Sequence, residues 1–218
     1  MGRIFDPDNG FWSVVRKIMY MVELSLVWCV CSLPLVTMGT SASALYYTMV
    51  KVVRWERSYP LKEFFKAWKQ NLKRGTILTI ILAAVGCMSF GADIMLGAYV
   101  FELKNAVDYI LCVLFLLKAI IFLGVICYVF PLLSRFDATV IKLLESALLL
   151  CIRHLPRTIC VAILFCIAVI LIRVESGLIL IVPALFCLIS SFLLEPVFAK
   201  GYEQQDIKEN MDTWFAEN

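Results

Sequence analysis

The sequence predicts an all-α, polytopic membrane protein, and three observations lead to this fold class. Hydrophobic residues make up 62% of the 218 residues and charged residues only 17%, whereas soluble domains are about half apolar and about a quarter charged. Five apolar stretches are near the length of roughly 20 residues that a transmembrane helix needs. Basic residues gather between the first two stretches. The stretches take up more than half of the chain, which leaves no room for a second, soluble domain.

The chain is therefore expected to form a single transmembrane domain over residues 1–218. The five predicted spans lie near residues 18–38, 76–100, 107–133, 156–174 and 178–199. Pro34 lies within the first stretch and has no backbone N–H, so it kinks or ends a helix there. Gly39, Thr40 and Ser41 then restart a helix, which Tyr59 and Pro60 break.

The distribution of charge predicts the orientation. The basic residues between the first two spans are Lys51, Arg54, Arg57, Lys62, Lys66, Lys69, Lys73 and Arg74. The positive-inside rule assigns such a loop to the cytoplasm. With the N-terminus outside and the C-terminus in the cytoplasm, most basic residues lie inside. Arg16 and Lys17 favour a cytoplasmic start instead, but the bias of the loop is larger.

Two cytoplasmic amphipathic segments are expected, a helical hairpin at residues 41–74 and a helix at residues 137–153. The apolar face of the hairpin's second helix consists of Leu61, Phe64, Phe65, Trp68 and Leu72. These positions recur at helical spacing, and lysines occupy the other face. Such a helix lies on anionic membrane lipid or docks in a groove of a partner protein, and we weigh the two equally. Because aromatic residues dominate interfaces, the expected partner anchors are Phe64, Phe65, Trp68 and Leu72.

Three charged residues lie within or beside the predicted spans. Lys118 is near the middle of the third span, Asp93 is in the outer half of the second, and Glu23 is near the outer end of the first. A charge inside a membrane is costly, so we expect Lys118 to pair with Asp93, or next with Glu23. We favour a structural ion pair over a proton or substrate relay, since a relay usually has more central acids and some histidine.

Ala83, Cys87 and Gly91 form a stripe of small residues on the second span. Small residues let two helix backbones approach closely in a membrane. The stripe therefore predicts helix packing, against either this chain or another subunit.

No motif indicates catalysis. The sequence has no P-loop, G-x-S-x-G or H-E-x-x-H motif, and its single histidine, His154, falls at a predicted helix end. None of the nine cysteines forms a C-x-x-C motif or a zinc-like Cys/His cluster. We therefore expect a non-enzyme with no catalytic residue, no metal, no cofactor and no nucleic-acid partner.

Two segments resemble the YesL family of bacterial membrane proteins. The first, residues 33–47, reads Leu-Pro-Leu-Val-Thr-Met-Gly-Thr-Ser-Ala-Ser-Ala-Leu-Tyr-Tyr, and the second, residues 63–71, reads Glu-Phe-Phe-Lys-Ala-Trp-Lys-Gln-Asn. Where the family motif has Gly-Ala-Ser, this chain has Gly39, Thr40 and Ser41. The resemblance implies a multi-pass protein of the bacterial plasma membrane. Members are typically encoded beside carbohydrate ABC importers and two-component sensors, which implies a role in sugar uptake or its sensing.

The expected function is that of a non-catalytic accessory or regulatory subunit of a carbohydrate ABC importer, with permease subunits as partners. One alternative is a small secondary transporter with Asp93 and Lys118 on its pathway, which predicts uptake by this chain alone in liposomes. The other is a membrane regulator of a two-component sensor kinase, which predicts co-purification with the kinase.

Overall fold

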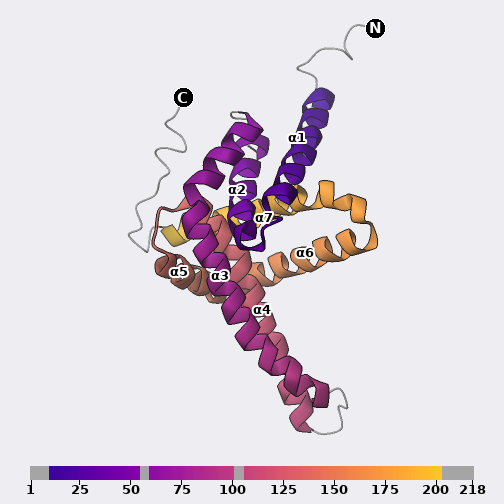
Figure 1. Cartoon of the computed structure of the whole chain (residues 1–218), viewed down its shortest axis with the longest axis vertical. Coiled ribbons are helices and arrows are strands. Elements are labelled where there is room, and N and C mark those ends of the chain that lie inside the picture. The colour runs from indigo at the N-terminus through magenta and orange to yellow at the C-terminus, as the bar shows by residue number, and fades with distance from the viewer. Residues whose placement is uncertain (1–9, 55–58, 101–105, 203–218) are drawn as a thin grey trace.

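The computed structural model describes residues 10–54, 59–100 and 106–202, and their side chains except those of residues 10–11, 92–100, 106–108 and 199–202. Within these ranges the regular structure is helical and includes no strand, which confirms the predicted fold class. The α-helices are α1 (Gly10–Cys31), α2 (Met38–Thr48), α3 (Pro60–Val100), α4 (Ala106–Arg135), α5 (Val140–Arg153), α6 (Leu155–Val174) and α7 (Val182–Tyr202) (Figure 1). Shorter helical turns are η1 (Leu35–Thr37), the π-helical η2 (Met49–Arg54) and η3 (Ser176–Leu180).

The first predicted span is not one continuous helix. Helix α1 ends at Cys31, and the chain turns through Pro34 before η1 and α2 begin. The hydroxyl of Thr37 donates to the Cys31 carbonyl oxygen at 2.8 Å, which satisfies one of the carbonyls left open at the end of α1. The expected break at Pro34 therefore falls inside the stretch that the sequence presented as a span.

The third α-helix differs most from expectation. An amphipathic helix ending near Arg74 and a separate span from Thr76 were expected, but α3 is a single helix of 41 residues. At 1.5 Å per residue it is about 61 Å long, twice the roughly 30 Å of a hydrocarbon core. Gly75 does not interrupt it, although glycine costs about 1 kcal/mol in a helix interior.

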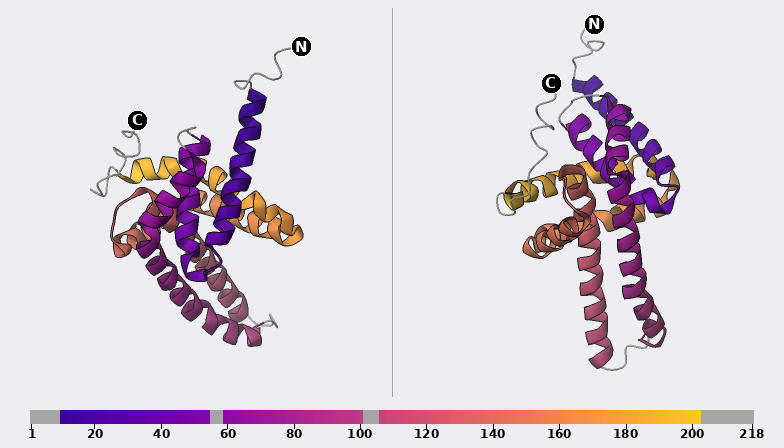
Figure 2. Two further views of the ribbon diagram at one scale, coloured as in Figure 1. Left: turned by 45° about the horizontal axis from the view of Figure 1, so that its top comes forward. Right: turned by 60° about the vertical axis from the view of Figure 1, so that its left-hand side comes forward.

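Helices α3 and α4 form a long antiparallel hairpin, and α6 and α7 form a second hairpin that runs crosswise to it (Figures 1 and 2). The N-terminal end of α1 lies at the same end of the molecule as the start of α3. The end of α3 and the start of α4 lie at the opposite end in all three views.

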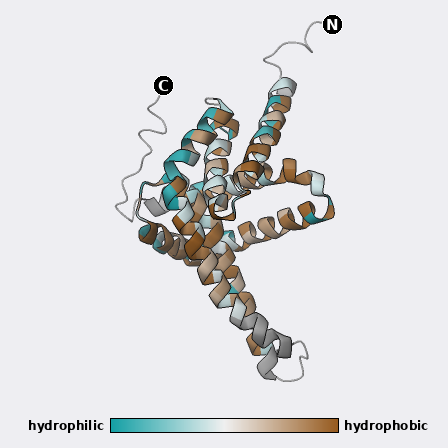
Figure 3. Cartoon of the chain, in the orientation of Figure 1, coloured by the Kyte–Doolittle hydropathy of each residue, from teal (hydrophilic) through white to brown (hydrophobic). Residues whose placement is uncertain are grey.

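In the described part of the chain, three helical segments are long and apolar enough to cross a membrane: Pro60–Gly91, Tyr109–Arg135 and Leu155–Val174. Val182–Phe198 is apolar but shorter. Helix α1 carries Arg16, Lys17 and Glu23 and is not among the three. Hydrophilic residues gather on the first part of α3, whereas much of the α3–α4 hairpin and of α6 is hydrophobic (Figure 3).

The core lies where α2 and the first half of α3 meet the second half of α4 and α7. Its largest fully buried side chains include Leu24, Tyr46, Met49, Phe64, Leu78, Tyr128, Leu194 and Phe198. Tyr128 and Phe136 each pack edge-on against Phe198, so the end of α4 is joined to the end of α7.

Candidate functional site

The two segments that resemble YesL proteins pack against each other. Ser41, on α2, accepts a hydrogen bond from the indole nitrogen of Trp68, on α3, at 3.2 Å. The Ser41 hydroxyl also lies 3.0 Å from the Cys31 carbonyl oxygen, to which it donates. One small hydroxyl therefore links the end of α1, the start of α2 and the middle of the amphipathic part of α3.

Two glycines allow the backbones to come this close. A Cβ at Gly75 would lie 3.0 Å from Thr40 Cα and would overlap the Thr40 hydroxyl. A Cβ at Gly39 would overlap the side chains of Phe130 and Thr79. Gly75 is therefore required for the contact between α2 and α3, and Gly39 for the contact of α2 with both α3 and α4.

Adjacent tyrosines on α2 reach two separate carboxylates. Tyr46 donates its hydroxyl to Glu195 Oε1, on α7, at 3.1 Å, and Glu195 Oε2 pairs with the guanidinium of Arg135 at the end of α4. Burial, together with the neighbouring Glu195 carboxylate, raises the pKa of the Tyr46 phenol well above its usual value. Tyr46, Arg135 and Glu195, here called the buried charge cluster, join three helices.

The second tyrosine, Tyr47, lies beside an ion pair between η2 and α3. Lys51 Nζ is 3.0 Å from Glu63 Oε2 and donates to the Tyr47 hydroxyl at 3.1 Å. Burial lowers the pKa of Lys51, but the hydrogen bonds with Tyr47 and Glu63 outweigh it and raise this pKa above its usual value. The charge of Lys51 is therefore retained in a largely buried position.

The π-helical turn η2 also directs Arg54 toward α7. The Arg54 guanidinium lies over the ring of Phe192, 4.5 Å from its centroid, and donates to the Ser191 carbonyl oxygen at 3.4 Å. Lys51 and Arg54, three residues apart on η2, therefore contact different helices, α3 and α7. These interactions tie the basic hairpin to the rest of the chain.

The predicted partner anchors do not all lie on the surface. Phe64 is 0% exposed, and Trp68 and Leu72 are half-buried, so α2 and its neighbours cover much of this apolar face. Phe65 is 42% exposed. Phe64 is therefore a core residue and is not available as a partner anchor, because folding of this chain already uses its surface.

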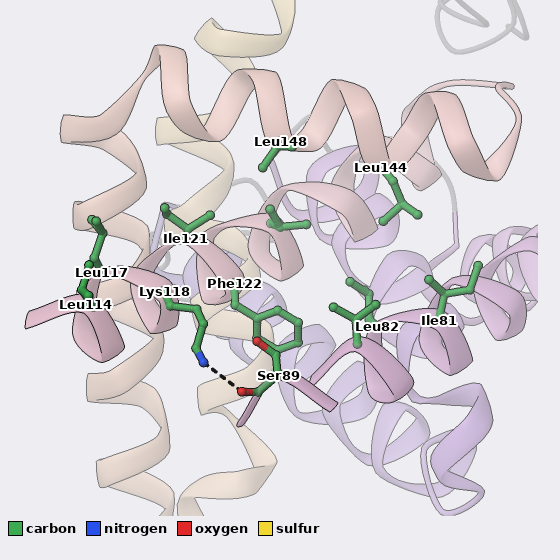
Figure 4. A pocket seen from close by; sticks show the side chains of 12 residues that line it. Ile81, Leu82, Ser89, Leu114, Leu117, Lys118, Ile121, Phe122, Leu144 and Leu148 are labelled. Carbon is green, nitrogen blue, oxygen red and sulfur yellow. Dashed lines mark hydrogen bonds between the residues drawn. The ribbon is translucent and has the colours of Figure 1, made fainter. Parts of the chain in front are cut away.

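Lys118 lies at an apolar groove of about 480 Å³ between α3, α4 and α5 (Figure 4). Its Nζ donates to the Ser89 carbonyl oxygen at 2.8 Å and lies 5.0 Å from the centroid of the Phe90 ring. Asp93 follows Ser89 by one helical turn on α3, and its side chain lies outside the described residues. Glu23 is on α1, half-buried. The pairing of Lys118 with Asp93, or next with Glu23, stays a prediction.

The small-residue stripe faces outward. Ala83, Cys87 and Gly91 are exposed, and a Cβ at Gly91 would meet no atom within 4 Å. On the side of α3 that packs against α4, a Cβ at Gly86 would lie 2.9 Å from the Phe122 ring.

Sequence reasoning missed the buried charge cluster. Arg135 and Glu195 are 60 residues apart, and each stands near the end of an apolar stretch, which is the only local signal they give. No group of three or more histidine, cysteine or acidic side chains that could hold a metal occurs in the described part of the chain.

Residues 21–91 match the model of a family described as a protein of unknown function, DUF624. DUF624 is the domain associated with YesL-like membrane proteins. The match covers about a third of the chain, and over this segment the chain is similar to the DUF624 family. No curated protein and no solved structure matches the chain.

The matched segment runs from within α1 to about three quarters of the way along α3 and includes both Tyr46 and Tyr47. The contact of Ser41 with Trp68 and that of Lys51 with Glu63 lie wholly within it. Arg135 and Glu195 lie beyond it, so Tyr46 connects the DUF624 helices to the second half of the chain.

Proposed function

We propose that this protein is a non-catalytic accessory or regulatory subunit of a carbohydrate ABC importer in the bacterial plasma membrane. The proposal rests on the different surroundings of the two halves of α3. Its first half is fixed to the chain through Trp68 and Glu63, whereas its apolar second half presents Ala83, Cys87 and Gly91 at the surface. A rigid membrane helix with an open small-residue face is suited to pack against a helix of another subunit. The YesL resemblance supports sugar uptake as the context.

The orientation proposed for the chain follows the basic residues of α3. Lys62, Lys69 and Lys73 are exposed on its first half, which favours the cytoplasm for that end of the molecule. The N-terminal end of α1 lies at the same end (Figures 1 and 2). We therefore propose a cytoplasmic start for α1, in place of the external N-terminus that the charge count favoured. Arg16 and Lys17 then obey the positive-inside rule as well.

Reporter fusions are expected to place the start of the chain and the turn before α3 in the cytoplasm, and the connection between α3 and α4 outside. The measurement is the activity of compartment-specific reporters fused at these three positions in intact cells. Labelling of the segment from Lys62 to Arg74 from outside the cell would overturn the orientation, because its lysines are the main support.

Replacing Cys87 by leucine is expected to release this protein from the importer without unfolding it. Cys87 is exposed, so the larger side chain would extend into the surroundings of this chain and keep a partner helix away. The measurement is co-purification of tagged protein with permease subunits from native membranes in mild detergent, together with sugar uptake by the cells.

The matched control is Met88→Leu, because Met88 is the neighbouring residue and is 80% exposed. It should leave co-purification and uptake unchanged. The proposal fails if the unaltered chain purifies alone and its deletion leaves sugar uptake intact. Recovery of a sensor kinase in place of permeases would favour the regulator alternative.

A further inference from the structure

The first half of α3 carries an exposed apolar ridge beside a row of lysines. The ridge consists of Leu61 and Phe65, which are exposed, and Leu72, which is half-buried, spaced as i, i+4 and i+11; its largest side chain, Phe65, is 42% exposed. The lysine row consists of Lys62, Lys66, Lys69 and Lys73, exposed and spaced as i, i+4, i+7 and i+11. At about 100° per residue, the ridge covers roughly 0–40° around the helix axis and the lysine row roughly 80–140°, so the two run side by side along the helix.

Because α3 is one unbroken helix, it holds the ridge and most of the lysine row at a distance from the membrane surface. The apolar part of the helix begins at Gly75, and Lys62 is thirteen residues earlier, which corresponds to about 20 Å along the axis. The headgroup region of one leaflet is about 5–7 Å thick, and the Debye length is about 8 Å at physiological salt. A typical tilt of about 20° shortens the height of Lys62 by only about 1 Å. Lys73 can contact lipid headgroups, but Lys62 and Phe65 lie above them.

The buried face of the same helix excludes a flat arrangement on the bilayer. Phe64 and Ala67 are buried against the chain, and Trp68 is bonded to Ser41. An interfacial helix needs its apolar face free to enter the lipid. This helix has used that face for folding, and only the narrow ridge is left.

We infer that the ridge and the lysine row together bind an acidic amphipathic helix of a cytoplasmic protein. Apolar side chains of such a helix would pack against Phe65, and its carboxylates would pair with the lysines. A helix with an apolar face and a neighbouring acidic face would place its apolar side chains on the ridge and its carboxylates on the lysine row at the same time. The inference concerns a soluble partner and does not depend on the importer proposed above.

The test uses the full chain in phosphatidylcholine nanodiscs and a fluorescent helical peptide of leucine and glutamate in amphipathic order. The peptide should bind, and binding should weaken as salt is raised. Phe65→Ala should weaken binding roughly tenfold, as removal of a central aromatic anchor does. Lys62→Gln combined with Lys69→Gln should weaken binding and reduce its dependence on salt.

Lys142→Gln is the matched control, since Lys142 is an exposed lysine on α5 that belongs to neither the ridge nor the lysine row. It should leave the affinity unchanged, and a peptide with lysine in place of glutamate should not bind. Equal melting temperatures of the variants in detergent verify that they fold. Peptide affinity that is the same for wild type, Phe65→Ala and the double lysine variant overturns the inference.

A second measurement separates this partner from anionic lipid. Each lysine of the row is acylated with a water-soluble reagent in phosphatidylcholine and in phosphatidylglycerol nanodiscs, and the modification is quantified by mass spectrometry. Anionic lipid should protect Lys73 and leave Lys62 as reactive as before. Equal protection of Lys62 and Lys73 would place the whole row on the bilayer and overturn the inference.

Discussion

Replacing Glu195 by alanine is expected to destabilise the protein by about 3–5 kcal/mol, the cost of removing one partner of a buried ion pair. Arg135 is 6% exposed and would keep its charge without the carboxylate that now faces it. Tyr46, 2% exposed, would lose the acceptor of its hydroxyl. Because the cluster joins α2, α4 and α7, the loss of stability should lower the melting temperature of the whole protein in detergent. The melting temperature is measured by heating samples and quantifying the folded protein that remains by size-exclusion chromatography.

Two further variants show whether the cost comes from unpaired buried charge. The double variant Arg135→Met, Glu195→Leu should recover most of the lost stability, since removing both charges leaves neither uncompensated. Asp137→Asn should have no measurable effect, because its pair with Arg74 is exposed and surface pairs contribute little. A double variant as unstable as Glu195→Ala would contradict this account of the cluster.

Replacing Gly75 by alanine is expected to destabilise the protein by about 1–3 kcal/mol, although alanine is the better helix former. The added methyl group would meet the backbone and hydroxyl of Thr40, so α2 and α3 would have to move apart. That movement would also strain the hydrogen bond between Trp68 and Ser41 on the same helix pair.

Gly91→Ala is the matched variant on the same helix. A Cβ there meets no atom within 4 Å, so the helix propensity alone acts and stability should rise by roughly 0.5–1 kcal/mol. Melting of both variants in the same detergent gives the comparison. Effects of the same sign at the two glycines would be inconsistent with the proposed role of Gly75.

The fold class could be predicted because composition and helical periodicity are local properties of the sequence. The break at Pro34 and the start of α3 at Pro60 follow from the missing N–H of proline. The continuity of α3 could not be predicted in this way. Gly75 looks like a helix end in the sequence, and only its contact with Thr40 shows that it permits helix packing instead.

The candidate site was less predictable for the same reason. Periodicity identified the apolar face that includes Phe64, but it could not say whether this chain or a partner covers that face. The pair of Arg135 with Glu195 joins residues 60 apart, and Arg54 contacts a carbonyl 137 residues away. Such pairs depend on how α4 and α7 meet, which no local pattern encodes.

The unbroken α3 also has a mechanical consequence. From Gly75 the helix extends about 22 Å to Pro60 on one side and about 38 Å to Val100 on the other, at 1.5 Å per residue. The contact of Gly75 with Thr40 divides it into a longer apolar arm and a shorter arm that carries exposed lysines. Because the shorter arm is bonded to α2 and η2 through Trp68 and Glu63, a tilt of roughly 10° about Gly75 would carry these elements along as it displaced the Pro60 end by about 4 Å. A movement of a neighbouring helix against Cys87 would therefore reach the Pro60 end of α3, because the helix between them has no break to absorb it.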